Sequence, residues 1–240
     1  LTMNSEQIIG LMEVTPGDPF ALRDAVRAAE AIRQAYWRMG YADAQVRSDE
    51  LRDPAAGAGV VDLLLTIDEG GRTRTGEVRI AGNSLTQHKV VRRELQDAGV
   101  RPDRPLDPRA VDEAETRLNQ TRLFEVGSVR ATIQPERPEV PGYRDVLVEV
   151  EETNTGSLSF GAAIGSDSGV TGLINLEQRN FDLLDYPSSF TEFVRGEAFR
   201  GAGQNFFISA QPGTEVQTYA ICLSEPRLFE TDYSLGGQVF

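Results

Sequence analysis

Cysteine and histidine are nearly absent from this chain, which has one of each, Cys222 and His88. A thiol protease needs both residues close together, and a structural zinc site needs several ligands of these types. Two single residues far apart in the sequence predict neither, so we interpret Cys222 as a small strand residue and His88 as a solvated one. We therefore expect no catalytic residue and no metal site.

Positive charge and long apolar runs are also scarce. The chain has 24 Lys and Arg residues against 37 Asp and Glu residues, a formal net charge of −13. Nucleic acid is excluded as a partner, because phosphate binding requires clustered basic side chains. No apolar run approaches the roughly 18 to 20 residues of a membrane-spanning helix, whereas a spanning strand needs only about 9 to 11 alternating residues. The sequence opens inside an expected helical module without a signal peptide, and we expect a piece of a longer protein.

Carboxylate pairs occur at Glu151-Glu152 and at Asp182 with Asp185. General acid–base chemistry needs two carboxylates that face one site, but adjacent residues of a strand point to opposite faces. We therefore interpret these residues as solvated charges and predict that the protein is not an enzyme.

The first 152 residues contain one order of elements twice. Helices over 5–12 and 21–41 precede strands over 42–51 and 59–70, and the order then repeats with an opening strand: strand 76–83, helices 87–99 and 109–124, strands 125–134 and 143–152. The opening strand ends at Gly82 and Asn83, a pair suited to a turn with positive φ. The period of roughly 75 to 80 residues is that of a small domain, longer than a solenoid repeat. A three-stranded sheet with both helices on one face is predicted for the complete module.

After Glu152 the sequence predicts strands and no further helix. The expected strands are 157–164, 170–179, 203–211, 217–225 and one starting at Tyr233. Apolar and polar residues alternate along them, with Leu158 and Phe160 on one face of the first strand and Ser159 on the other. This alternation suits the wall of a membrane barrel with a polar interior, and equally a soluble β-sandwich with one buried face.

Certain segments carry a more specific pattern: YWRMGYADAQV (36–46), DEGGRTRTGEVRIAGNSLTQHKVVRREL (68–95), RLNQTRLFEVGSV (117–129), VEETNTGSLSFGAAIGSDSGVTG (150–172) and YAICLSEPRLFETDYSLGGQVF (219–240). In sequence and order they resemble the BamA family of outer-membrane protein assembly factors. The resemblance implies α+β POTRA modules of β-α-α-β-β order, followed by antiparallel strands of an incomplete transmembrane β-barrel. It implies a POTRA module lacking its first strand at 1–70, the membrane-proximal POTRA module at 71–152, and about five barrel strands at 153–240.

The sequence departs from the family at one turn. Asn180 and Phe181 are separated from the expected Gly-x-Gly, residues 201–203, by an insertion at 182–200. A first strand leaving the module at residue 152 runs outward, so the turn at 167–169 is external and the second strand returns at residue 180. The resemblance thus implies that the insertion is periplasmic. Its acidic and aromatic composition predicts contact with a module or partner better than burial in lipid; the alternative is a mobile turn with no partner.

The resemblance also implies a function. The family's proteins lie in the bacterial outer membrane with their POTRA modules in the periplasm, bind unfolded outer-membrane proteins, and template their folding and insertion through a lateral barrel seam. The implied partners are these unfolded proteins, accessory assembly lipoproteins and outer-membrane lipid; no cofactor is implied. Two alternatives stay open: a related translocator (TamA-like, or a two-partner secretion transporter), and a soluble periplasmic binding scaffold with a β-sandwich.

The candidate sites that follow are partner surfaces. Glu94 matches the family's acidic contact with an accessory lipoprotein, or is an ordinary helix-surface charge. The strand expected to pair with a client is Ser157, Leu158, Ser159, Phe160, Gly161, Ala162, Ala163 and Ile164; its glycines either weaken the seam or curve the wall. The edge expected to dock an extended client is Ala44, Gln45, Val46, Arg47, Ser48, Asp49, Glu50 and Leu51, unless its charges only protect it.

Overall fold

The computed structural model describes residues 1–15, 17, 19–52, 60–165, 169–196, 198–228, 231 and 233–240, without the side chains of residues 193 and 194. The chain divides into two compact units. The first unit comprises Leu1–Arg79, Leu95–Ala114 and Ala131–Leu147, and the second comprises Ile80–Glu94, Glu115–Arg130 and Val148–Phe240. The division passes through the second module, whose helices and strands contribute to both units. Apart from Gly169, the expected outer turn at 167–169 lies outside the described residues.

The first module consists of α1 (Ser5–Leu11), α2 (Leu22–Arg38), β1 (Gln45–Leu51) and β2 (Asp62–Asp68). Asn4 begins α1 with a capping box, because its side chain accepts from the Gln7 amide and the Gln7 side chain accepts from the Asn4 amide. The two strands pair antiparallel along their full length. The core of the module comprises Ile8, Ile32, Tyr36 and Ala44, with Val46, Leu65 and Ile67 of the hairpin packed against it.

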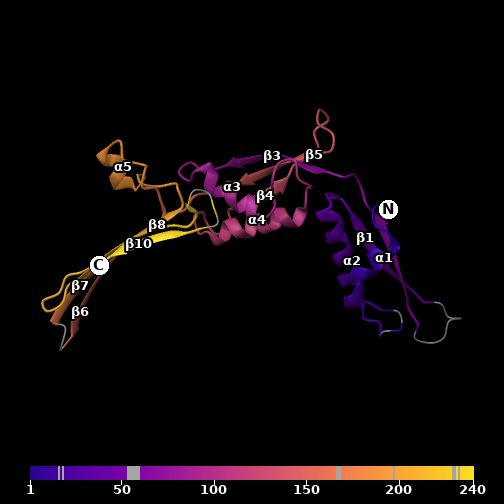
Figure 1. The fold of residues 1–240 in the computed structure, drawn as a ribbon, viewed down its shortest axis with the longest axis horizontal. Helices are drawn as coiled ribbons and strands as arrows, with labels where there is room; N and C mark the ends of the chain where they lie inside the picture. The colour runs from indigo at the N-terminus through magenta and orange to yellow at the C-terminus, as the bar shows by residue number, and fades with distance from the viewer. Residues whose placement is uncertain are drawn as a thin grey trace. The chain divides into compact units, whose positions relative to one another are not determined.

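The second module consists of β3 (Arg74–Ala81), α3 (His88–Asp97), α4 (Pro108–Gln120), β4 (Arg130–Ile133) and β5 (Tyr143–Glu149). Its sheet has the order β3-β5-β4, and both helices lie along one face of it (Figure 1). The buried side chains of the two helices recur at helical spacing: Val90, Val91, Leu95, Val111, Ala114 and Leu118. This is the β-α-α-β-β architecture that the sequence predicts.

The last part of the chain is an antiparallel sheet with β6 (Gly156–Gly165), β7 (Gly169–Phe181), β8 (Gln204–Gln211), β9 (Thr218–Glu225) and β10 (Leu235–Val239). Its order is β10-β9-β8-β7-β6, so each strand pairs with its neighbour in the sequence. The predicted fold class is confirmed, with the strand sheet open rather than closed. The prediction that no helix follows residue 152 is wrong, because the insertion contains a short helix, α5 (Phe190–Arg195).

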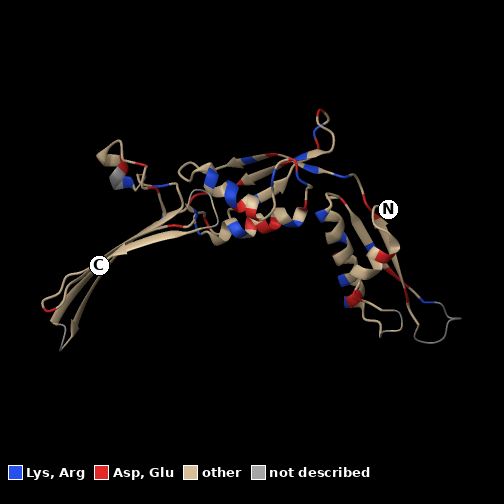
Figure 2. Cartoon of the chain, in the orientation of Figure 1, with Lys and Arg blue, Asp and Glu red and all other residues tan. Residues whose placement is uncertain are grey.

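One face of this sheet is apolar and exposed. In the register, Leu158 is opposite Leu176 and Phe160 is opposite Ile174, so these side chains share a face. Leu158 is 57% exposed and Phe160 72% exposed, which a water-soluble sheet of this size would normally bury. Figure 2 shows how few charged residues the strands carry. An outward apolar face with polar residues on the other side is typical of a barrel wall in lipid. Of the helices described, none is long and apolar enough to cross a bilayer.

Candidate functional site at the base of the strand sheet

The junction between the second module and the strand sheet begins at the predicted turn after β3. Gly82 has φ of +94°, and a Cβ atom there would lie 1.8 Å from the carbonyl oxygen of Val150. Only glycine fits such a position, since any side chain would both strain the backbone and collide with the neighbouring strand. Asn83 extends the turn by donating from Nδ2 to the Thr86 carbonyl at 2.8 Å. The turn therefore delivers residues 84–86 to the end of β5.

Glu152 holds this turn from the other side. Its Oε2 accepts from the Ser84 hydroxyl and from the Leu85 amide, each at 2.8 Å. Its Oε1 accepts from the Thr86 amide. Burial raises the pKa of Glu152, but the hydrogen bonds from Thr86, Ser84 and Leu85 outweigh burial, so that its pKa is lowered overall. The interpretation of Glu152 as a solvated charge is thus wrong: the ionised carboxylate is a structural acceptor just before α3.

Asn180 lies at the centre of the junction. It is 1% exposed, donates from Nδ2 to the Thr86 hydroxyl at 2.8 Å and accepts at Oδ1 from the Gly203 amide at 3.0 Å. Thr86 is also buried. Because a buried amide side chain is costly unless its groups are paired, these bonds specify one arrangement of the end of β7, the start of β8 and the turn before α3.

Gln87 supplies a second set of contacts to the same region. Its amide donates to the Gly201 carbonyl at 2.9 Å, and its Nε2 donates to Oδ2 of the buried Asp182 at 2.5 Å. Asp182 also accepts from the Leu184 amide at 2.9 Å, so it too is not the solvated charge that the sequence suggested. Gly201 has φ of +123°, and a Cβ atom there would lie 2.4 Å from the Leu85 carbonyl oxygen. Backbone therefore packs directly on backbone at this point.

Arg200 ties the end of the insertion to the linker before β6. Its Nη2 donates to the Thr153 carbonyl and the Thr155 hydroxyl, both at 3.1 Å, and its Nη1 donates to the Gly196 carbonyl at 3.3 Å. Its own amide donates to Asp185 Oδ2 at 3.1 Å. The insertion at 182–200 thus contacts both the turn before α3 and the linker. Its predicted position in the periplasm stays a prediction.

The predicted client strand, 157–164, is the body of β6 and lies at one end of the sheet order. Every residue from Gly156 to Gly165 pairs with β7, and none pairs with another described strand on the opposite edge. A Cβ atom at Gly161 would meet only Leu173 atoms at 3.6 Å or more, so no contact in the sheet requires glycine there. Among the described strands, one backbone edge of β6 is therefore unpaired, and no residue of β6 is charged.

The predicted docking edge, 44–51, includes one residue that does not fit the prediction. Ala44 is 4% exposed and belongs to the core of the first module. The rest forms β1, which pairs with β2 on one side only among the described strands. Docking of a client on β1 stays a prediction, now restricted to Gln45–Leu51.

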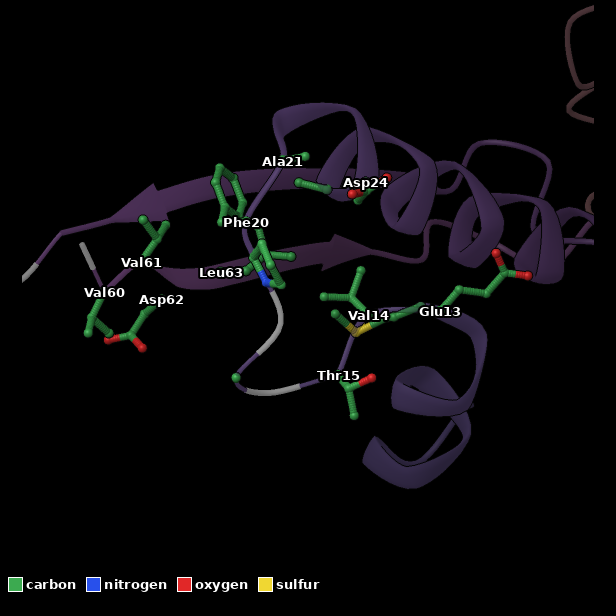
Figure 3. Close-up of a pocket in the computed structure, with 14 residues that line it drawn as sticks. Glu13, Val14, Thr15, Phe20, Ala21, Asp24, Val60, Val61, Asp62 and Leu63 are labelled. Atoms are coloured by element: carbon green, nitrogen blue, oxygen red, sulfur yellow. The ribbon is translucent and has the colours of Figure 1, made fainter.

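A pocket of about 380 Å³ in the first module was not anticipated from the sequence. It is formed by described residues of the α1–α2 connection, by the start of α2 and by the residues at the start of β2. Figure 3 shows Phe20, Val61 and Leu63 around it, with Glu13 and Asp24 among the other lining residues. The pocket is lined by apolar side chains together with the acidic residues Glu13, Asp24 and Asp62. No sequence signal marks it, because its walls come from separate segments.

Glu94 lies on α3 and its side chain is only 18% exposed. Its Oε1 is 3.7 Å from Nε of Arg93, whose side chain lies beside Gly203 at the junction. The structure therefore leaves only a small part of Glu94 for an accessory protein, and that contact stays a prediction.

Across the part of the chain that the structure describes, no group of three or more His, Cys, Asp and Glu side chains is placed to hold a metal ion.

Thr86, Gln87, Asn180 and Arg200 were not among the predicted site residues. Asn180 had a signal, since it begins the turn motif that the insertion divides. Its partner Thr86 is 94 positions earlier in the sequence, and no local pattern relates the two.

The fold defines a modular protein. Two α+β modules are followed in the sequence by an open antiparallel sheet that carries few charges. A family model described as POTRA, surface antigen variable number repeat, matches residues 2–70 and 73–153. The chain therefore belongs to the POTRA family and is of the BamA type within it.

Two curated relatives support this assignment. The outer membrane protein assembly factor BamA of Neisseria meningitidis serogroup B (strain ATCC BAA-335 / MC58) is 26% identical over 170 residues, 71% of this chain and 20% of that protein. BamA of Neorickettsia risticii (strain Illinois) is 25% identical over 183 residues, 76% of this chain and 21% of that protein. The chain thus spans about one fifth of the length of these relatives.

Solved structures share the fold. The crystal structure of BamA from Haemophilus ducreyi lacking POTRA domains 1–3 has a TM-score of 0.76 at 24% identity, covering 96% of this chain and 39% of that chain. The crystal structure of Haemophilus influenzae BamA POTRA3–5 has a TM-score of 0.50 at 24% identity, covering 62% of this chain and 56% of that chain.

Proposed function

We propose that this chain is the membrane-proximal part of an outer-membrane protein assembly factor. Its modules lie in the periplasm, and β6–β10 begin the barrel wall in the outer membrane. The curated relatives, which are outer membrane protein assembly factors by name, support this proposal. The observation that carries it is β6: a strand of 10 residues with exposed apolar side chains on one face and a backbone edge unpaired among the described strands.

In the proposed function, the edge of β6 that pairs with no described strand gives the mechanism its driving force. In hydrocarbon each unpaired backbone N–H or C=O costs several kcal/mol, because no water is present to replace the missing hydrogen bond. An unfolded client strand has the same unsatisfied groups. Pairing the two edges removes both costs at once, so β6 acts as a template that selects extended, alternating client segments. No nucleotide is needed, since burial of the client's apolar side chains supplies the remaining free energy.

The junction residues keep this template in a defined position relative to the turn before α3. Asn180, Glu152 and Arg200 hold the ends of the first strands through buried or multiply paired hydrogen bonds. A strand that binds clients along its backbone edge gains affinity when its end is held in place. If β6 moved freely, part of the binding free energy would be spent on ordering it. In the proposed function the edge of β1 and the pocket beside α2 hold clients before they reach β6, and accessory lipoproteins dock on the modules.

Cysteine cross-linking tests the proposal with a matched pair of positions. Ser159 of β6 and Ser209 of β8 both lie opposite Asn175 of β7, on the same polar face of the sheet. Ser159 is at the free edge, whereas Ser209 has paired strands on both sides. In full-length protein with Cys222→Ser, we expect Ser159→Cys to form a disulfide with a cysteine in the terminal strand of an arrested outer-membrane client, and Ser209→Cys to form none.

Other outcomes separate the alternatives. A translocator passes its substrate through the lumen, so both positions, which face the lumen, would cross-link equally. Failure of Ser159→Cys to cross-link while the client still inserts would contradict templating by β6.

A further inference from the structure

The insertion at 182–200 exposes large apolar side chains that the junction does not use. Its root is fixed by Asp182 and Arg200, but Leu184 is 78% exposed, Tyr186 70% and Phe190 81%. Exposed apolar side chains gathered in one short segment mark a binding surface. Figure 1 shows α5 standing off the strands at the end of the sheet where β8 begins.

An aromatic group connects this segment to the apolar face of the strands. Phe206 pairs with Gln178 in the register and so shares the face of Leu176 and Leu158. The Phe206 ring stacks on Phe181 at 4.5 Å between centroids, Phe181 stacks on Phe199 at 5.8 Å, and Phe199 meets Tyr186 edge-on at 6.0 Å. Aromatic residues that end an apolar strand face are typical of the level where hydrocarbon meets headgroups.

A pocket of about 700 Å³ opens on the face of the sheet that carries Leu158 and Leu176. Leu158 and Leu176 line its strand side, and Gln178, Arg195 and Arg200 line its other side. Arg195 is exposed and makes no ion pair with any residue that the structure describes. Glu152 also lines the pocket, but its carboxylate already accepts from Ser84, Leu85 and Thr86. The pocket therefore joins the Leu158 and Leu176 side chains to two guanidinium groups, within a lining whose other residues are mostly polar.

We propose that residues 183–196 and 198–200 form a foot on the periplasmic leaflet of the outer membrane, in which the pocket binds the phosphodiester of a phospholipid. Arg195 faces the phosphate, and Arg200, whose guanidinium already donates to Gly196, Thr153 and Thr155, adds positive charge to the same side of the pocket. Leu158 and Leu176 contact the first part of an acyl chain, and Leu184, Tyr186 and Phe190 enter the headgroup region. This differs from the expectation that the insertion avoids lipid, because its described acids Asp182, Asp185 and Glu192 point carboxylate oxygens at partners within the protein. The inference rests on the proposed function, since it requires β6–β10 to lie in a membrane.

Spin labels on the full-length protein with Cys222→Ser, in bilayers of phosphatidylethanolamine and phosphatidylglycerol, test the foot. Labels are placed at Phe190→Cys, at Phe160→Cys on the strand face, and at Val126→Cys, which is 101% exposed on the second module. We expect the oxygen-to-nickel collision ratio at Phe190 to exceed that at Val126 at least about threefold. If the ratio at Phe190 equals that at Val126 while Phe160 reports lipid, the proposed membrane contact of the insertion is wrong and the proposed function still stands. Phe160 in water would overturn the proposed function as well.

The amount of phospholipid that copurifies with the protein tests the pocket separately. Arg195→Gln should reduce the phospholipid that copurifies with the detergent-extracted protein about fivefold, whereas Arg179→Gln, next to Gln178 and on the opposite face, should leave it unchanged. Inorganic phosphate should not displace the retained lipid, because it has no apolar chain for Leu158 and Leu176 to contact. Displacement by phosphate, or equal loss in both variants, would overturn the phospholipid assignment.

Discussion

Replacing Asn180 with alanine should loosen the junction. The substitution removes the acceptor of the Gly203 amide and the donor to the Thr86 hydroxyl. Each buried group left without a partner costs roughly 1–3 kcal/mol. Since Thr86 can rotate its hydroxyl, we expect a total of about 2–3 kcal/mol, dominated by the Gly203 amide. Water entering the space left by the Asn180 side chain would reduce this free-energy cost but would also open the junction to solvent.

Hydrogen exchange on the full-length protein measures this loss directly. A loss of about 2–3 kcal/mol corresponds to roughly 30- to 150-fold faster exchange of the Gly203 amide if it exchanges through local opening. Asn175→Ala is the matched control. Its side chain accepts from the Ser209 hydroxyl at 2.8 Å but is only half-buried, so water replaces the bond and the exchange rate should stay within about threefold.

Thr86→Val completes a double-mutant cycle with Asn180→Ala. The two substitutions share one hydrogen bond, so their effects should fall short of additivity by roughly 0.5–1.5 kcal/mol. Wild-type exchange at Gly203 in Asn180→Ala, or full additivity in the cycle, would refute the reasoning.

Two further changes test the same region. Gly82→Ala should destabilise the second module by at least roughly 2 kcal/mol, because the new Cβ would lie 1.8 Å from the Val150 carbonyl oxygen; thermal melting checks this, with Gly71→Ala, whose surroundings are open, expected to be silent. Glu152 has a lowered pKa when folded, so its stabilising contribution is present above the pKa of the unfolded chain and is lost as pH falls through the folded pKa. Hydrogen-exchange protection of residues 84–86 should therefore decline below about pH 4.5 in the wild type. In Glu152→Gln this protection should be lower at neutral pH and should not change with pH in that window. Parallel curves of protection against pH in the wild type and the variant would contradict the role of the carboxylate.

Much of the fold follows from local patterns. The repeated order of helices and strands, the alternation along β6 to β9 and the Gly82 turn are each written within a few neighbouring residues. Secondary structure of this kind depends on periodicity and on backbone constraints, which one sequence displays directly. The same holds for the apolar face of Leu158 and Phe160, since alternation fixes which side chains share a face.

The junction could not be predicted in the same way. Glu152 and Asp182 look like ordinary surface acids in the sequence, and only the fold brings donors from residues 84–87 to them. Ala44 continues an edge strand in the sequence but lies in the core, because the chain turns there to pack under α2. The helix α5 is short enough that its periodicity carries no signal over one turn and a half. For Glu152, Asp182 and Ala44, the deciding contacts come from other segments of the chain.

The central claim is that β6 is a strand of a membrane wall, and an accessibility scan from Ser157 to Ile164 in the full-length protein tests it most directly. With one spin label per variant in a bilayer, we predict alternation with a period of two. Leu158, Phe160, Ala162 and Ile164 should report lipid, and Ser157, Ser159, Gly161 and Ala163 should report water. A scan without alternation, or with every position in water, would contradict the account.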